Sequence, residues 1–252
     1  MKFVWNNWFS LSKHKRKKPR TERKNDSTNR DFVGTNIGFG ETNRRRCPPA
    51  VRRLPYFCSS MFQTLFQKFD EKVPLTSDEK ELAKAFFLPK KLRKRQYLLQ
   101  EDDVCKYFAF VEKGMLRSYT VDEKGVEHII QFAFEGWWIS DQYSFLTGEP
   151  SSYNIDALED CELLLLSKPA EEELLKQVPK MERYFRILLQ NSLIAMQRRL
   201  VSSLSHSAEE KYNELVQSCP TIPQRVPQHM MASFLGITPE TLSRIRRKIT
   251  SG

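Results

Sequence analysis

The sequence predicts an α+β protein: an antiparallel β-sandwich or barrel, then one long helix, then a helix-turn-helix. Short alternating runs rich in Tyr, Phe, Val and Ile, separated by turn residues, occupy residues 96–166 and are typical of an antiparallel sheet. Apolar residues at helical spacing follow over residues 179–205. Two short amphipathic segments that meet at Gly236 complete the pattern.

Length and composition favour one or two domains. No apolar run approaches the roughly 18 residues of a membrane span, so no membrane partner is expected. The five cysteines are widely spaced and contain no C-x-x-C pair, which favours the reducing cytoplasm and argues against a disulfide framework or an iron–sulfur cluster. We therefore expect a cytoplasmic protein that holds no metal and no cofactor.

Positive charge is concentrated toward the two ends of the chain. Residues 1–60 hold 15 Lys and Arg against 4 Asp and Glu, whereas residues 61–252 hold 26 against 27. The first segment lacks apolar periodicity, so a disordered basic tail is expected, in which Lys13–Arg20 either grips phosphates or stays solvated. Upstream sequence attached by a misplaced start is a further explanation, since a well-patterned domain begins at Met61. From Arg225 the chain is again basic, as DNA contact requires.

Helices are expected before the sheet. Residues 61–87 have apolar residues at helical spacing, with a helix start at Thr76–Glu79 and an end at Pro89. The strands are expected at residues 96–100, 107–111, 115–121, 127–134, 153–158 and 161–166. The turn residues Asp122–Gly125 predict a hairpin between the third and fourth of these strands.

Residues 228–247 predict a helix-turn-helix. Gly236 can take the positive φ that ends the first helix, and Thr238–Glu240 begins the second with a hydroxyl N-cap, a proline and an acid. The expected shared core consists of Met231, Leu235, Ile237, Leu242 and Ile245. This layout leaves polar residues on the outer face of the second helix, where they can enter the major groove of double-stranded DNA.

A long helix is expected over residues 179–205. Its apolar stripe consists of Met181, Tyr184, Phe185, Leu188, Leu189, Leu193, Met196 and Leu200. Either the whole stripe packs on the β-domain of the same chain, or part of it pairs with the same helix of a second copy. We expect a homodimer, because helix-turn-helix proteins usually read two half-sites as a two-fold dimer. A capping box at Ser207–Glu210 begins the next helix.

In the order of these elements, residues 61–252 resemble the Crp/Fnr superfamily of bacterial transcription regulators. The glycines of VEKGMLRSYT and DEKG fall at the hairpin turns of that family, and ITPETLSRIRR resembles its recognition helix. The resemblance implies a cyclic-nucleotide-binding-like β-roll of the jelly-roll type over residues 61–178, a dimerisation helix over 179–205 and a winged helix-turn-helix over 206–252. It also implies a regulator rather than an enzyme. The implied partners are double-stranded DNA, a second copy of the chain, RNA polymerase and an unidentified small-molecule effector.

The resemblance places base readout on the second helix of the motif. In the family this helix often carries Glu, then Ser and Arg three and four residues later, which here are Glu240, Ser243 and Arg244. Arginine can bond guanine O6 and N7, and glutamate can accept from cytosine N4. Some members carry a basic residue in place of Pro239, so a different base preference is expected there. The remaining expected DNA contacts are Gln228, His229, Thr238, Thr241, Arg246, Arg247 and Lys248. For the basic residues the alternative is a solvated last turn stabilised by the helix dipole.

The expected sensor departs from the family pattern. A cyclic-nucleotide site needs an arginine for the phosphate, but Ser151, Ser152 and Tyr153 stand where it is expected, and WWISD replaces the usual Gly-Glu-Leu signature. Without that cation a buried phosphate charge is uncompensated, so tight binding of cAMP or cGMP is not expected. The residues that would either line a pocket for another ligand or form core and surface of the roll are Trp137, Trp138, Asp141, Tyr143, Ser144 and Phe145.

Two other classes of function compete with the regulator. One is a ligand-binding or interaction module of the same fold that has lost DNA contact, although the intact Glu240, Ser243 and Arg244 argue against it. The other is an enzyme, which is disfavoured because the chain offers no nucleophile elbow, P-loop or paired metal ligands. His128 lies in a strand pattern and is expected to be an ordinary sheet residue rather than a heme ligand.

Overall fold

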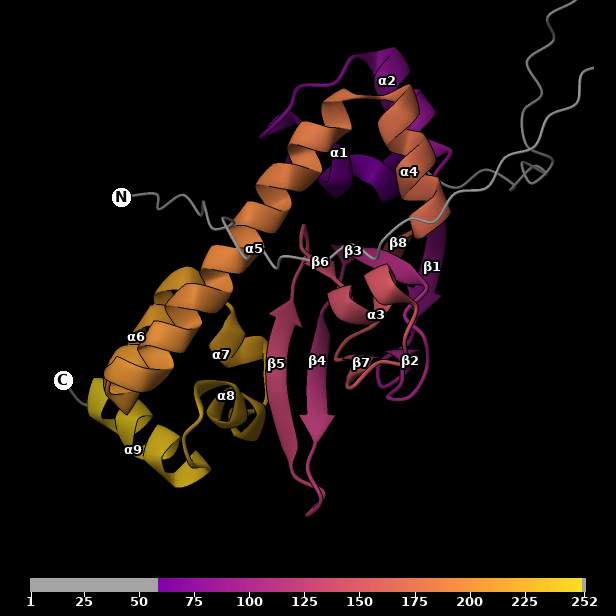
Figure 1. Ribbon diagram of the computed structural model, residues 1–252. Helices are drawn as coiled ribbons and strands as arrows, with labels where there is room; N and C mark the ends of the chain where they lie inside the picture. The colour runs from indigo at the N-terminus through magenta and orange to yellow at the C-terminus, as the bar shows by residue number, and fades with distance from the viewer. Residues whose placement is uncertain (1–58, 251–252) are drawn as a thin grey trace, which may run out of the picture. The chain divides into compact units, whose positions relative to one another are not determined.

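The computed structural model describes residues 59–250 (Figure 1). The expected basic tail over residues 1–60, with Lys13–Arg20, lies outside this part except for its last two residues. In the described part, two four-stranded antiparallel sheets form a β-roll, with helices before and after it. The predicted α+β class and jelly-roll architecture are confirmed.

Two short helices, α1 (Gln63–Asp70) and α2 (Ser77–Lys84), follow the 3-10 turn η1 (Ser59–Phe62). Helix α2 begins at a capping box, as expected. Helix α1 is capped from a distant strand: the Glu112 carboxylate accepts hydrogen bonds from the backbone amides of Thr64 (2.5 Å) and Leu65 (3.1 Å). Burial raises the pKa of Glu112, while these amides favour its charged form. The start of α1 therefore depends on a residue 48 positions after Thr64.

The strand order is β1-β8-β3-β6 in one sheet and β2-β7-β4-β5 in the other. The strands are β1 (Leu88–Leu92), β2 (Tyr97–Leu99), β3 (Tyr107–Lys113), β4 (Leu116–Val121), β5 (Glu127–Ala133), β6 (Trp138–Ile139), β7 (Asn154–Ala157) and β8 (Cys161–Ser167). The six predicted strands are present, each within two residues of its expected ends. β1 and β6 are additional. Pro89 lies inside β1 instead of ending a helix, which a strand tolerates at the edge of a sheet.

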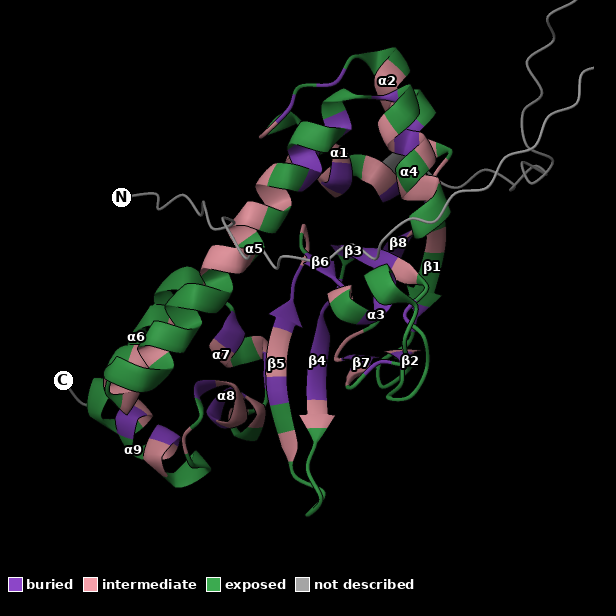
Figure 2. Ribbon diagram, viewed as in Figure 1, coloured by how far each residue is buried: buried purple, intermediate pink, exposed green. Residues whose placement is uncertain are grey.

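Two apolar clusters form the core (Figure 2). The first fills the roll and reaches α1, α4 (Lys168–Gln177) and the first turns of the long helix; in it the Trp138 ring nitrogen donates to the Tyr184 hydroxyl (3.0 Å). The second lies between β4–β5 and the C-terminal helices and contains Phe132 of the roll together with Met231 and Leu242. The roll and the helix-turn-helix therefore share a core.

The long helix α5 (Lys180–Ser205) lies where the sequence predicts it. Its first turns bury Met181, Tyr184 and Phe185, whereas most of its second half is exposed (Figure 2). The exposed large apolar residues on α5 are Leu189, Met196, Leu200, Val201 and Leu204. The predicted stripe is thus only partly covered by its own β-domain. In the part of the chain that the structure describes, no helix is long and apolar enough to span a bilayer.

The C-terminal helices are α6 (Ala208–Ser218), α7 (Ile222–Arg225), α8 (Gln228–Leu235) and α9 (Pro239–Thr250). α6 begins at the predicted capping box. The expected wing is wrong for the described residues, which contain helices and no strand after β8. Pro220, Pro223 and Pro227 occupy the segment before α8. Within this segment α7 forms a single short turn of helix.

Candidate nucleic-acid interface

Helices α8 and α9 are joined by a tight turn at Gly236, which has φ 65° and ψ 36°. The Ile237 amide donates to the Ala232 carbonyl (3.0 Å) and the Gly236 amide to the Ser233 carbonyl (3.1 Å), which satisfies the last carbonyls of α8. Any other residue at position 236 would be strained by this left-handed backbone, even though the space beside it is open. The glycine therefore fixes the turn between the two helices.

Helix α9 begins as the sequence predicts. The Thr238 hydroxyl accepts a hydrogen bond from the Thr241 amide (3.2 Å), and Pro239 is the first helical residue. The buried residues shared by α8 and α9 are Met231, Ala232, Leu235, Leu242 and Ile245. This packing leaves the opposite face of α9 toward solvent.

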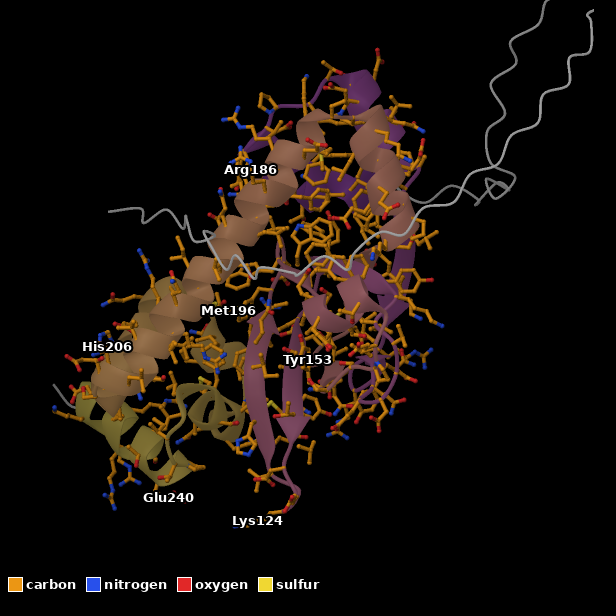
Figure 3. All side chains as sticks on the ribbon, in the orientation of Figure 1. Lys124, Tyr153, Arg186, Met196, His206 and Glu240 are labelled. Atoms are coloured by element: carbon orange, nitrogen blue, oxygen red, sulfur yellow. The ribbon has the colours of Figure 1, made fainter. Side chains whose placement is uncertain are left out.

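A groove of about 660 Å³ lies between the N-terminal ends of α8 and α9. It is lined by Gln228, His229, Pro239, Glu240, Ser243, Arg244 and Arg247, all of them predicted DNA contacts. Glu240 and Arg244 are exposed, and Glu240 lies at the outer edge of these helices in Figure 3. The structure thus brings the three predicted base-reading side chains together on one accessible surface.

Glu240 is held in its charged form. Hydrogen bonds from its own backbone amide and from the Thr238 hydroxyl, together with the positive charge of Arg244, lower the pKa of Glu240. At neutral pH the groove therefore presents an ionised acceptor close to a guanidinium donor. This combination suits the donor and acceptor edges of a G·C base pair.

Gln228 has a contact of its own inside the motif. Its side-chain amide donates to the Pro239 carbonyl (3.2 Å), which joins the first turns of the two helices. Among the described side chains none caps α8, whose N-cap is Pro227, so the first amides of this helix suit a phosphate. His229 lies in the same first turn and is exposed.

Four predicted DNA contacts lie outside the groove lining: Thr238, Thr241, Arg246 and Lys248. The Lys248 ammonium lies 2.7 Å from the Glu209 carboxylate and ties the end of α9 to α6. The hydroxyls of Thr238 and Thr241 lie 3.1 Å apart and form the N-cap. Thr238, Thr241 and Lys248 therefore have structural partners before any DNA is present.

The six residues expected near a sensor site do not line one pocket together. Trp138 and Phe145 belong to the core of the roll, whereas the side chains of Trp137 and Tyr143 are about half exposed. A cavity of about 320 Å³ lies beside α3 (Gln142–Thr147), and its lining includes Phe145 and Ser144 but is mostly contributed by neighbouring strands and loops. The arrangement agrees with the alternative that these residues are core and surface of the roll.

Asp141 is buried and its carboxylate is satisfied within the protein. One oxygen accepts from the Ser144 amide (3.2 Å) and thereby caps α3, and the other accepts from the Ser151 hydroxyl (2.8 Å). The Ser144 hydroxyl accepts from the Cys105 amide (2.8 Å) and donates to the Glu149 carbonyl (2.5 Å). The Cys105 contact could not be read from the sequence, because Cys105 lies 39 positions before Ser144.

The remaining candidate groups have ordinary surroundings. His128 lies 3.0 Å from Asp122 at the exposed hairpin. Cys105 and Cys161 are buried free thiols; burial raises the pKa of both, that of Cys161 to about 11. Among the described residues, no group of three His, Cys, Asp or Glu side chains could hold a metal ion.

The roll and the chain as a whole resemble known proteins. The cyclic nucleotide-binding domain family matches residues 89–178. The fumarate and nitrate reduction regulatory protein of Vibrio cholerae is 24% identical over 187 residues, which is 69% of this chain and 74% of that protein.

Two solved structures illustrate the shared fold. The c-di-GMP responsive global regulator CLP of Xanthomonas campestris has a TM-score of 0.56 at 14% identity, covering 70% of this chain and 92% of its own. FixK2 of Bradyrhizobium japonicum has a TM-score of 0.55 at 17% identity, covering 66% of this chain and 85% of its own. These findings show that residues 89–178 match the cyclic nucleotide-binding domain family and that the chain shares its fold with these structures.

Proposed function

We propose that this chain is a dimeric, sequence-specific DNA-binding regulator that reads a palindromic site through α9. The groove between α8 and α9 carries the proposal, because it gathers Glu240, Ser243 and Arg244 on an accessible surface. Glutamate can accept from cytosine N4, and arginine can donate to guanine O6 and N7. His229 and the first amides of α8 border the same groove and suit backbone phosphates.

The second half of α5 supports the dimer. Leu189, Leu193, Met196 and Leu200 follow one another in steps of four, three and four residues, which is the spacing of a coiled-coil seam. Met196 is 64% exposed and Leu200 is 61% exposed in the single chain. Pairing with the same helix of a second copy would bury this seam. A two-fold pair would also present two recognition helices to half-sites about 34 Å apart.

The surroundings of Asp141 support a sensor that does not bind cyclic nucleotides tightly. The buried carboxylate of Asp141 accepts a hydrogen bond from the Ser151 hydroxyl. Ser151 stands where a bound phosphate would need a cation. A second anion placed beside this carboxylate would be uncompensated and repelled. Calorimetric titration with cAMP should give no binding at micromolar concentration, and heat of binding in that range would contradict this part of the proposal.

Binding of the full chain to DNA tests the proposed function. A palindromic duplex selected from a random pool is titrated with the parent and with Arg244→Ala, which should bind at least about tenfold more weakly because a bidentate arginine–guanine contact is lost. Arg93→Ala, which removes the same charge from an exposed site on the roll, is the control and should bind like the parent.

Two results would count against the proposal. Equal affinity of Arg244→Ala and the parent for the selected site would show that Arg244 does not read bases. A folded parent that enriches no sequence from the pool would favour the interaction module without specific DNA binding.

A further inference from the structure

Side chains from two helices occupy the open edge of β5, which is the last strand of its sheet. The Ser233 hydroxyl, on α8, accepts from the Ile129 amide (3.0 Å) and donates to the Glu127 carbonyl (2.8 Å). The exposed groups of an edge strand normally pair with water or with another strand. Here one hydroxyl hydrogen-bonds both an amide and a carbonyl of the strand, and this pair of bonds fixes where α8 lies along β5.

Arg199 of α5 makes the second contact with this edge. Its guanidinium donates to the carbonyls of Ile129 (2.9 Å) and Ile130 on β5 and to the Phe234 carbonyl on α8 (3.2 Å). It also lies 4.1 Å from the centre of the Phe234 ring. One side chain thus joins the long helix, the roll and the helix-turn-helix. We call Ser233 and Arg199 together the β5 clamp.

The remaining contact between the helix-turn-helix and the roll is less directional. Most of it is the shared apolar core, which resists separation but does not by itself fix an angle. Arg225 of α7, just before the helix-turn-helix, donates two hydrogen bonds to each of the Glu135 and Glu159 carboxylates of the roll (2.6–2.9 Å). Hydrogen bonds depend on angle as well as distance, and those of the β5 clamp are made by α8 itself or reach its backbone, so the clamp fixes where α8 lies on β5.

We propose that Ser233 and Arg199 are positioning residues for DNA binding. They hold the helix-turn-helix at one orientation on the roll and on α5, so that the two recognition helices of a dimer meet half-sites at one spacing. Neither residue is among those that line the base-reading groove. This inference rests on the proposed function, and it adds an explanation of what sets the spacing between half-sites that the dimer prefers. Loss of the clamp should relax spacing and leave readout within each half-site unchanged.

The test compares the full-length parent with Ser233→Ala on three duplexes that share the same half-sites. One duplex has the preferred spacing, one is shorter by a base pair and one is longer. Each added base pair turns one half-site by roughly 34° about the DNA axis, since a turn holds about 10.5 base pairs. The parent should therefore lose affinity on the altered duplexes. For Ser233→Ala the ratio of affinities between correct and altered spacing should fall about tenfold, the scale of one or two lost hydrogen bonds.

Three further variants separate positioning from general stability. Ser233→Thr keeps the hydroxyl and should restore the spacing preference. Arg199→Gln should relax it as Ser233→Ala does, which gives a second reading if Ser233→Ala folds poorly. Ser218→Ala removes an exposed hydroxyl that donates to the Leu215 carbonyl of its own helix (2.9 Å), and this variant should behave like the parent.

Amide hydrogen exchange in the absence of DNA tests the contact between Ser233 and β5 independently of binding. Exchange at the Ile129 amide should accelerate in Ser233→Ala and return to the parent rate in Ser233→Thr. Faster exchange with an unchanged spacing preference would overturn the proposal, because Ser233 would then be structural only. If the parent shows no sequence-specific binding to any duplex, the proposed function itself fails and the inference with it, whereas the exchange rates still report on the contact.

Discussion

Two polar regions of this molecule place their charged groups in opposite surroundings. In the groove of α8 and α9, Glu240 and Arg244 are exposed and face a surface large enough for a partner. Around α3, the Asp141 side chain belongs to a residue only 2% exposed, and both of its oxygens take donors from the protein. The comparison teaches that a charged group serves an outside partner only where its own chain leaves it accessible. We assign recognition to the first region and stability to the second.

The largest expected effect is on stability, at Asp141. Asp141→Ala removes the cap of α3 and leaves the buried Ser151 hydroxyl without this acceptor, so the free energy of unfolding should fall by about 3 kcal/mol. Asp141→Asn keeps one oxygen to accept from the Ser144 amide, and its NH2 can donate to the Ser151 hydroxyl, which can itself donate to the Tyr153 carbonyl (2.9 Å), so it should lose less. Urea denaturation measures both. If Asp141→Ala has the same free energy of unfolding as the parent, this carboxylate is not needed for stability and is free to serve a ligand. The contrast between the two regions would then fail.

Glu240→Gln should change recognition and leave stability nearly unchanged. The carboxylate is exposed, so unfolding in urea should shift by less than about 0.5 kcal/mol. Preference for cytosine over other bases at the contacted position should fall about tenfold, because the amide is a weaker acceptor and can also donate. Competition between duplexes that differ at single positions measures this preference. A uniform loss of affinity on every sequence would point to a phosphate-facing role instead.

Two glycines with positive φ provide a matched pair of variants. Gly236 lies between α8 and α9 and Gly125 lies in the β4–β5 turn; both have positive φ, and a methyl group on either would meet open space. Gly236→Ala and Gly125→Ala should therefore each lower the free energy of unfolding by about 1 kcal/mol. Only Gly236→Ala should also weaken DNA binding, because it tilts α9. If both variants lose the same DNA affinity, the β4–β5 hairpin also contributes to DNA binding.

The smallest expected effect is a pH dependence at the Arg225 ion pairs. Burial alone would raise the pKa of Glu135, but hydrogen bonds and charge from Arg225 lower it below the ordinary value. A carboxyl whose pKa is lower in the folded state stabilises the fold above its unfolded pKa of about 4.3, and this contribution disappears as pH falls through the folded pKa. The pair is partly exposed, so its worth is roughly 0.2–1 kcal/mol.

Parent and Glu135→Gln unfolded in urea between pH 3 and pH 7 would show this directly. The difference between them should be constant near neutrality and shrink below about pH 4. A difference that grows as the solution is acidified would mean that Glu135 is protonated more readily in the folded protein, contrary to its pairing with Arg225.

Local patterns were the predictable part of the molecule. The cap at Thr238, the glycine turn and the apolar spacing all lie within one short segment, so the groove could be anticipated residue by residue. β6 could not be predicted, because a strand of two residues shows no alternating pattern. β1 was missed because it contains Pro89, which in the sequence indicates the end of a helix. The wing was expected from family resemblance alone, and the described residues contain no strand after β8.

Contacts between distant residues were not predictable. Ser233 and Ile129 are 104 positions apart, and Arg199 reaches β5 across 69 or 70. A serine in a helix or an arginine in a charged stretch carries no mark of such a partner in a single sequence. The same limit explains why the sequence predicts Asp141 as a candidate ligand-binding residue. Only the structure shows that its carboxylate accepts from the Ser151 hydroxyl.

The distant cap on α1 sets an order of events during synthesis. The amides of Thr64 and Leu65 leave the ribosome well before Glu112, which must arrive with β3 to accept their hydrogen bonds. Until then the first helix has a frayed start and its apolar side, with Leu65 and Phe69, has no sheet to rest on. A nascent chain stalled short of β3 would therefore be an early target for chaperones and proteases.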